Sequence, residues 1–168
     1  MNPFFQLQAD VKARLEAHEF LADIPIVTEE LGDVNNRVSV SLVKGGLKAN
    51  DAGKAGIAIL VITPSGSGSG QKTSTRSLSL QTTAVRVVVF VKPLINDGAT
   101  GLQKAPLDVH YAILQQMLCW DRGYQAGNVP IALRAWDSRE TPDGQISYFA
   151  DFEVAQFINL QPTNSNPT

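Results

Sequence analysis

The stretch Leu78–Pro93, LSLQTTAVRVVVFVKP, decides how the rest of this chain is organised. Within it, Thr83–Lys92 is predicted to be a strand, because every second residue from Val85 to Val91 is valine and β-branched residues at a period of two are typical of a strand. Val88 and Phe90 make the other face of the strand apolar as well. A strand that is apolar on both faces is typical of the middle of a sheet with a helix covering at least one side. We therefore expect this strand to be central in its sheet.

One helix and two extended segments are predicted before the central strand. Pro3–Ala22 has the spacing of an amphipathic helix, with Gln8 among the residues placed off its apolar face. Asp23–Thr28 is predicted to be extended because proline disfavours helix in the residue before it, and Ile57–Thr63 is predicted to be a buried strand. Asn36–Lys48 fits either a strand or a helix and is left open. The apolar stripe of the helix is Phe4, Leu7, Val11, Leu15 and His18.

A low-complexity segment, Ser65–Ser79 (SGSGSGQKTSTRSLS), separates two of the predicted strands. Its composition is typical of a flexible segment. Because strands precede and follow it, we expect a long β-hairpin whose flexible tip projects from the body of the protein. A connection of this length inside a compact domain is usually functional or disordered.

A second helix and a second hairpin are predicted after the central strand. Pro106–Trp120 carries two adjacent apolar stripes, so we expect the helix to be packed on more than one side. Ile131–Glu140 and Gln145–Ile158 are predicted strands joined by a tight turn at Thr141–Gly144. The first stripe is Leu107, Tyr111, Leu114 and Leu118, and the second is Val109, Ile113, Met117 and Trp120.

The order of these elements indicates the fold class. Helices and strands do not alternate strictly, which favours an α+β fold with an antiparallel or mixed sheet flanked by two main helices. We expect a single domain over residues 1–160, with a disordered or extended tail at residues 161–168. The long projecting hairpin and the C-terminal hairpin belong to this domain.

Composition excludes several classes of function. The chain has 168 residues, 43% of them hydrophobic, and a formal net charge of −2, which is too small for a typical nucleic-acid or membrane-surface protein. A single cysteine, Cys119, rules out an intramolecular disulfide and fits a reducing cytoplasm. The N-terminus has charges where a signal peptide has its apolar run, and the longest apolar run is too short to span a membrane. We therefore expect a soluble intracellular product.

One motif resembles a phosphate-binding loop. In Gly66–Thr73 the first glycine, Lys72 and Thr73 have the offsets of G-x-x-x-x-G-K-[ST], but Gln71 replaces the second glycine. The motif also needs a helix after the loop, whose N-terminus faces the phosphate, and the sequence here is strand-like. A nucleotide-binding enzyme that uses residues 66–73 is therefore kept only as an alternative.

No catalytic or metal-binding group of residues is found. His18 and His110 belong to no ligand-spaced cluster, so no metal and no cofactor is expected. Cys119 lies between two apolar residues and is predicted to be a buried, inert thiol. Asp137 and Glu140, like Asp143, lie beside the predicted turn and are interpreted as solvated charges. The sequence does not predict an enzyme.

The succession of elements resembles the tail-terminator and tail-completion proteins of long-tailed bacteriophages. The likeness runs from ADVKARLEAH through IPIVTEE, VRVVVFVKP and PLDVHYAILQQML to the closing hairpin LRAWDSRETPDGQISYFADFEVAQFI. The resemblance implies a structural virion protein that forms a ring, the hexamer typical of the family, on the tail tube. Other neck, head-completion or baseplate subunits fit the same pattern.

The resemblance also implies partners and contact sites. The partners are copies of the chain itself, the tail tube protein, the sheath of a contractile tail and the head–tail connector, with DNA passing through the ring without sequence-specific recognition. The protein would be assembled in the bacterial cytoplasm and reside in the tail or neck of the virion. Strand pairing between subunits is one form that the contacts take. The residues assigned to subunit or partner contacts are Lys72, Thr73 and Arg76 of the tip, Glu29 and Glu30, and Pro142 and Asp143 of the second turn.

Overall fold

Five strands and three helices make up the part of the chain that the structure describes. The structure is a computed structural model, and it describes residues 3–28, 56–68, 78–99, 101–120, 131–140, 142 and 144–159. The helices are α1 (Pro3–Glu16), α4 (Pro93–Asn96) and α5 (Pro106–Leu118). The strands are β1 (Ile26–Thr28), β2 (Ile57–Gly68), β3 (Leu78–Val91), β4 (Ala132–Glu140) and β5 (Ile146–Asn159).

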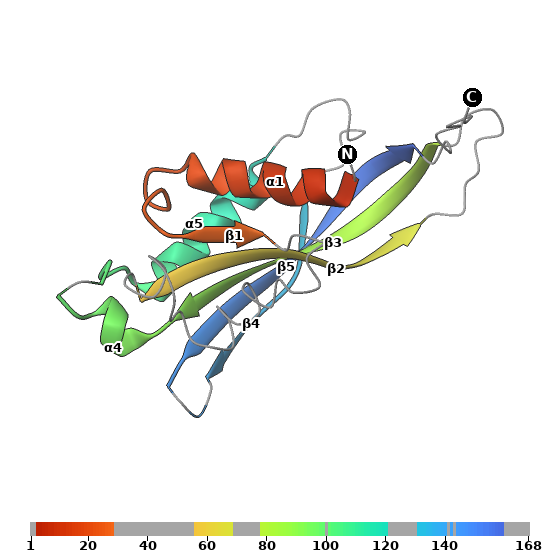
Figure 1. The fold of residues 1–168 in the computed structure, drawn as a ribbon. Coiled ribbons are helices and arrows are strands. Elements are labelled where there is room, and N and C mark those ends of the chain that lie inside the picture. The colour runs from red at the N-terminus through yellow and green to blue at the C-terminus, as the bar shows by residue number, and fades with distance from the viewer. Residues whose placement is uncertain are drawn as a thin grey trace, which may run out of the picture.

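The strands form one mixed sheet in the order β1-β2-β3-β5-β4 (Figure 1). β1 pairs with β2 in parallel, and the other three pairs are antiparallel. β3 is the middle strand, as its two apolar faces predict, and Val88 and Phe90 on its second face are buried. The mixed sheet with its helices confirms the predicted α+β fold.

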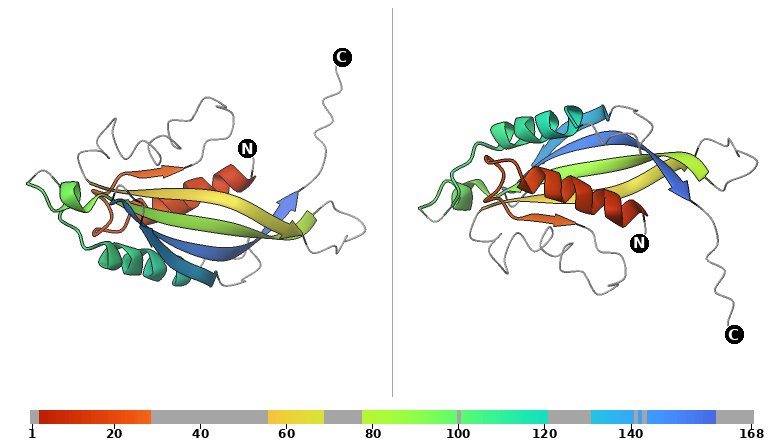
Figure 2. Two further views of the ribbon diagram at one scale, coloured as in Figure 1. Left: turned by 90° about the horizontal axis from the view of Figure 1, so that it is seen from below. Right: turned by 90° about the horizontal axis from the view of Figure 1, so that it is seen from above.

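Both long helices cover the same face of the sheet (Figure 2). The alternate residues Val85, Val87, Val89 and Val91 of β3 point to this face and are at most 1% exposed. They join the buried residues of α1 and α5 in one hydrophobic cluster, which also takes in Phe152 of β5. The period of two in the central strand therefore selects the face on which the core forms.

The first helix is shorter than the sequence predicts, and its buried side includes a residue that was expected outside the apolar face. It ends at Glu16, and a series of turns leads from it to β1. Leu7, Val11 and Leu15 are completely buried, as expected. Gln8 was expected off the apolar face, and this prediction is wrong. Its side chain is 1% exposed, and its amide donates a hydrogen bond of 2.8 Å to the hydroxyl of Thr63.

β2 and β3 extend further than predicted, into the low-complexity segment. Ser65–Gly68 are paired with β3, and the register shifts between Ile62 and Ser65, beside Pro64. Leu78 and Ser79 likewise belong to β3 and pair with β5. The flexible tip was therefore predicted too long at both ends, because backbone pairing does not need apolar side chains. Residues 69–77, 29–55 and 160–168, which include the ambiguous Asn36–Lys48 and the predicted tail, lie outside the described residues.

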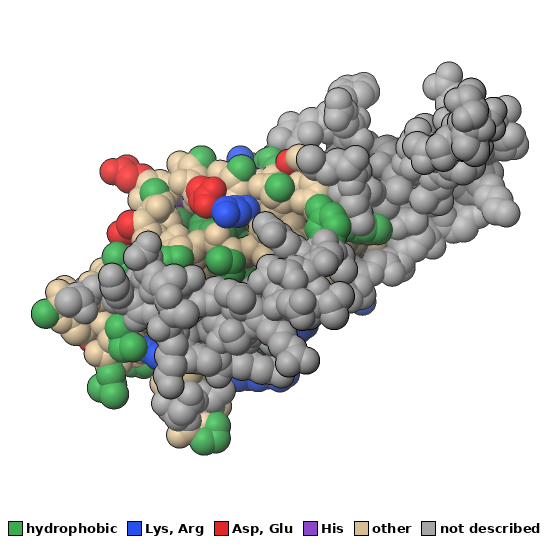
Figure 3. Space-filling model, viewed as in Figure 1, with side chains coloured by type: hydrophobic (Ala, Val, Ile, Leu, Met, Phe, Trp, Pro, Cys, Tyr) green, Lys and Arg blue, Asp and Glu red, His purple; other side chains and the backbone are tan. Residues whose placement is uncertain are grey.

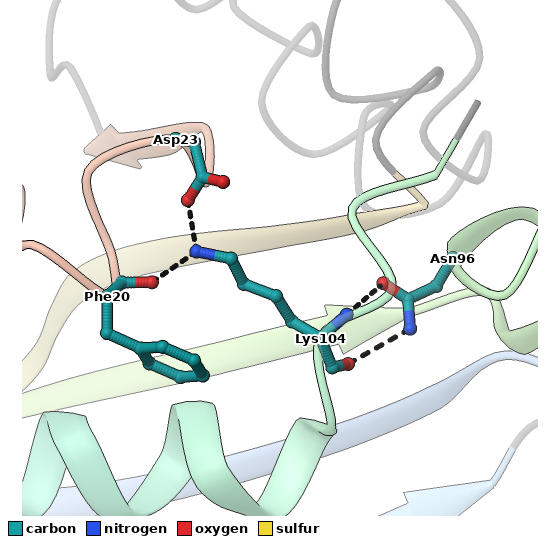
Figure 4. Close-up of polar contacts among 4 residues, drawn as sticks. All are labelled: Phe20, Asp23, Asn96 and Lys104. Atoms are coloured by element: carbon teal, nitrogen blue, oxygen red, sulfur yellow. Dashed lines mark hydrogen bonds and ion pairs between the residues drawn. The ribbon is translucent and has the colours of Figure 1, made fainter. Parts of the chain in front are cut away.

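A polar network ties the start of α5 to the rest of the fold (Figure 4). Asn96 at the end of α4 is buried, and its amide donates to the Lys104 carbonyl oxygen at 3.0 Å. The backbone N–H of Lys104 donates to the side-chain oxygen of Asn96 at 3.4 Å. The Lys104 ammonium donates to the Phe20 carbonyl oxygen and the Asp23 carboxylate, after the end of α1. This network fixes the connection that leads into α5.

Gly56 makes the close packing of this connection possible. Its φ is +71°, a left-handed conformation that favours glycine, and its carbonyl oxygen accepts a hydrogen bond from the Lys92 N–H at 2.8 Å. A Cβ at this position would lie 2.2 Å from the backbone nitrogen of Asn96. The start of β2, the end of β3 and α4 therefore meet at a place that admits no side chain.

Candidate functional site

The contact residues predicted from the sequence lie mostly outside the described part of the chain. Pro142 is described, and it is exposed in the turn between β4 and β5. Gly144 in the same turn has a φ of +74°, which agrees with the predicted turn residues. The other six predicted residues are not among those described, so their assignment stays a prediction. They are Glu29, Glu30, Lys72, Thr73, Arg76 and Asp143.

The residues with reactive or ligating side chains do not gather into a site within the described ranges. There, no group of three or more His, Cys, Asp or Glu residues could hold a metal ion. Cys119 follows α5 directly and is exposed, so the prediction of a buried thiol is wrong. Asp137 and Glu140 are exposed on β4, as solvated charges would be.

The most unusual surface feature is an apolar stripe along α5. The helix was expected to be packed on more than one side, and this is wrong for its first stripe. Leu107 is 59% exposed, Tyr111 61% and Leu118 43%, while Leu114 is partly buried against the core. The second stripe, with Val109, Ile113 and Met117, is buried as predicted. One apolar stripe of α5 thus forms the core, and the other faces solvent.

The placement of α1 explains why this stripe is uncovered. The Arg14 guanidinium of α1 donates to the Gln116 carbonyl oxygen of α5 at 2.7 Å and lies 5.4 Å from the Trp120 ring centroid. On a helix with about 100° per residue, Gln116 lies on the opposite side of the axis from the stripe of Leu107 and Leu118. Both helices share one face of the sheet, so α1 covers one side of α5 and leaves the other free.

Trp136 of β4 continues the apolar stripe onto the sheet. It is 59% exposed, and its ring centroid lies 5.8 Å from that of His110 on α5. The His110 ring also lies 6.2 Å from the ring of Tyr148 on β5. The His110 ring thus lies between the backbone of α5 and the strands β4 and β5, next to the stripe. We call Leu107, Tyr111, Leu114 and Leu118 of α5 together with Trp136 the α5 surface.

His110 is a titratable group next to the α5 surface whose pKa is perturbed by burial. Its side chain is buried, and its Nε2 atom has no hydrogen-bond partner. Burial lowers the pKa of His110 below the ordinary value for histidine. The ring is therefore neutral at pH 7 and fills space between the helix and the sheet as an aromatic side chain does.

β4 forms an edge of the sheet, and several features protect it. It pairs with β5 alone among the described strands, and the pairing shifts register between Leu133 and Ala135. The Ser138 N–H donates to the Asp137 carboxylate at 2.8 Å, so this backbone donor has a side-chain partner within the chain. The carboxylate thus occupies a backbone donor of the edge strand. A bulge and charges are the usual means of preventing strand addition at an edge.

The face of the sheet that the helices do not cover carries an ordered ion pair. Arg86 of β3 binds Asp151 of β5 through two hydrogen bonds of 2.6 and 2.8 Å. This contact raises the pKa of Arg86 above its ordinary value. The guanidinium groups of Arg86 and Arg139 lie 5.0 and 5.3 Å from the Phe149 ring centroid. All four residues have partners within the chain, so we assign them to stability.

Hydrophobic side chains are also exposed at the end of the molecule that carries α4 (Figure 3). Leu94 of α4 is 94% exposed. Single exposed apolar residues are common on protein surfaces, whereas a contiguous group often marks an interaction site. In the α5 surface, apolar side chains follow one another along one side of a helix, and Trp136 lies next to them across the His110 ring, so we take it as the candidate functional site.

Sequence reasoning named the α5 stripe but not its role, and it did not place Trp136 or His110 beside the stripe. The signal for the stripe was present, because two apolar stripes on one helix exceed what a single sheet face can cover. Nothing in the spacing of the residues indicates that Trp136 and His110 meet, since the strand and the helix are brought together by the fold alone.

Comparisons with known proteins identify no family for this chain. The sequence matches no known family model and no curated protein. A solved structure from Akkermansia muciniphila matches with a TM-score of 0.36 and 8% identity, covering 96% of this chain and 78% of that one. A likeness at this level carries no argument about function. Among the described helices, none is long and apolar enough to cross a membrane.

Proposed function

We propose that this chain is a structural, non-enzymatic subunit of a bacteriophage tail. It is a tail terminator, which forms a ring, in the hexameric form that the resemblance implies, at the end of the tail tube. The ring stops growth of the tube and provides the surface to which the head–tail connector binds. The tube protein and the sheath of a contractile tail are its other partners. The protein is assembled in the bacterial host and resides in the virion.

The α5 surface is the observation that carries this proposal. A subunit that works alone has no use for a stripe of leucine and tyrosine side chains exposed beside a half-exposed tryptophan. A subunit of a ring covers such a surface with its neighbour. The order of elements also supports the proposal, because the sequence resemblance rests on the same succession of helix, extended segment, central strand, helix and hairpin.

Other subunits of the neck, the head-completion complex or the baseplate are alternatives with the same architecture. They differ from a terminator in the structure that they bind. Negative-stain imaging of the purified protein with tail tubes separates them. Rings on one end of the tubes are the expected result. Rings that leave the tube ends bare would assign the chain to another position in the particle, and a protein that forms no rings would contradict the proposal.

The nucleotide-binding alternative has less support. Gly66, Ser67 and Gly68 are paired within β2 with residues of β3, whereas a phosphate-binding loop leaves its strand before the first glycine. The next described element after this segment is the strand β3, where the motif needs a helix. Titration with a fluorescently labelled ATP tests this alternative, and we expect no saturable binding.

A further inference from the structure

We infer that the α5 surface is the contact through which one copy of this chain packs against a second copy, by side-chain packing and not by strand addition at β4. The inference rests on the proposed function in one respect, that copies of the chain assemble with one another. It goes further by naming the mode of contact and the element of the second copy, a helix, that the surface receives.

The spacing of the exposed apolar residues along α5 is the first argument for this contact. Leu107, Tyr111, Leu114 and Leu118 follow one another at intervals of four, three and four residues. This spacing keeps apolar side chains on one side of a helix over several turns and is typical of a helix that packs against another helix. The occupant that it fits is a helix of a neighbouring copy.

The exposed apolar area of the α5 surface is the second argument for this contact. Aromatic side chains have about 150–250 Å² each to bury, so the exposed parts of Tyr111, Trp136 and the leucines amount to about 400 Å². A stable protein interface buries roughly 800 Å² per partner, with an apolar centre and a polar rim. The α5 surface supplies the centre. Asp108 and Gln115, which are exposed on α5 beside the stripe, supply polar groups for the rim.

The edge of β4 is the third argument, because it distinguishes side-chain packing from strand addition. Strand addition needs free N–H and C=O groups along the edge. Here the bulge beside Arg134 interrupts the strand, and the Asp137 carboxylate occupies the Ser138 N–H. The edge therefore disfavours a partner strand, while the side chain of Trp136 next to it remains available.

Light scattering of matched variants tests this inference. Leu118→Glu and Tyr111→Glu place a charge in the centre of the proposed contact, and we expect each to weaken self-association by at least about 100-fold. Leu94→Glu is the matched control, because it makes the same change at a leucine that is more exposed but lies outside the α5 surface. Ser138→Pro removes a backbone donor of the edge strand, and we expect assembly to persist. Circular dichroism and thermal melting establish that each variant is folded.

The possible outcomes separate the inference from the proposed function. If the wild type assembles and the α5 variants assemble equally well, the inference is wrong, and the proposed function then depends on whether the assemblies are rings on the ends of tail tubes. If Ser138→Pro abolishes assembly in a folded protein, strand addition is the correct mode. If the wild type is monomeric but caps tail tubes, and Leu118→Glu does not, the surface binds the tube protein and the second copy is the wrong occupant. A wild type that forms closed dimers without rings supports the contact and contradicts the tail terminator.

Discussion

Asn96 provides the sharpest test of how the connection into α5 is held. Its side chain is 2% exposed. The side-chain amide forms hydrogen bonds with the carbonyl oxygen and the N–H of Lys104 and with the Asp97 carboxylate. Replacing it by alanine leaves the Lys104 carbonyl oxygen and N–H without these partners. A hydrogen bond contributes about 1 kcal/mol net, and the lost volume adds to this, so Asn96→Ala should lower the free energy of unfolding by about 2 kcal/mol.

Asn96→Asp is the more informative variant, because it keeps the size of the side chain. The introduced carboxylate can still accept from the Lys104 N–H, but it faces the Lys104 carbonyl oxygen and the Asp97 carboxylate where the amide donated. We expect a loss of about 3 kcal/mol at pH 7. The pKa of the introduced carboxyl is raised in the folded state, so this loss disappears below its unfolded pKa and grows as the pH rises through the folded pKa.

Urea denaturation at fixed protein concentration, followed by circular dichroism at pH 7 and pH 4, measures both effects. Gln103→Glu is the matched control, because it makes the same amide-to-acid change at an exposed neighbour. It should change stability by less than about 0.5 kcal/mol. The account of Asn96 is refuted if Asn96→Ala is as stable as the wild type, or if Asn96→Asp is no less stable than Asn96→Ala at pH 7.

Three further changes test other parts of the fold. Gly56→Ala combines a strained left-handed φ with a Cβ that meets the backbone of Asn96, and thermal melting should show a loss of more than about 3 kcal/mol; an unchanged melting temperature would contradict the close packing. The pKa of His110 is lowered in the folded protein, so this residue contributes stability that is present above its unfolded pKa. That stability is lost as the pH falls from the unfolded pKa through the folded pKa, by up to about 1.4 kcal/mol per pH unit. His110→Phe keeps the ring and should flatten the pH dependence of stability between pH 7 and pH 5, whereas an unchanged slope would show that another group titrates. A double-mutant cycle of Arg86→Met and Asp151→Asn should give a coupling of about 1 kcal/mol, because the pair is bidentate but partly exposed, and zero coupling would contradict its assignment to stability.

The sheet was largely predictable because its signals are local. The alternation of valines in β3 depends only on neighbouring residues, and it marked both the central strand and the face on which the core forms. The C-terminal hairpin followed from turn residues between two strand-like segments. The strands β2 and β3 were predicted too short, because serine and glycine are typical of loops yet pair through their backbones as other residues do.

The candidate site was less predictable because it depends on what covers each face. Periodicity showed that Leu107, Tyr111 and Leu118 share one side of α5, but not that α1 packs on the other side. The burial of Gln8 depends in the same way on Thr63, which lies 55 residues further along the chain. Contacts between distant segments decide such cases, and no local pattern records them.

The mass of the protein in solution, measured by size-exclusion chromatography with light scattering, tests the central claim most directly. The wild type should elute as an assembly of about six times the 18.1 kDa chain, visible as rings by negative stain, and Leu118→Glu should elute as a folded monomer. A wild type that stays at the mass of one chain at micromolar concentration, alone and with tail tubes present, would contradict both the ring and the assembly role of the α5 surface.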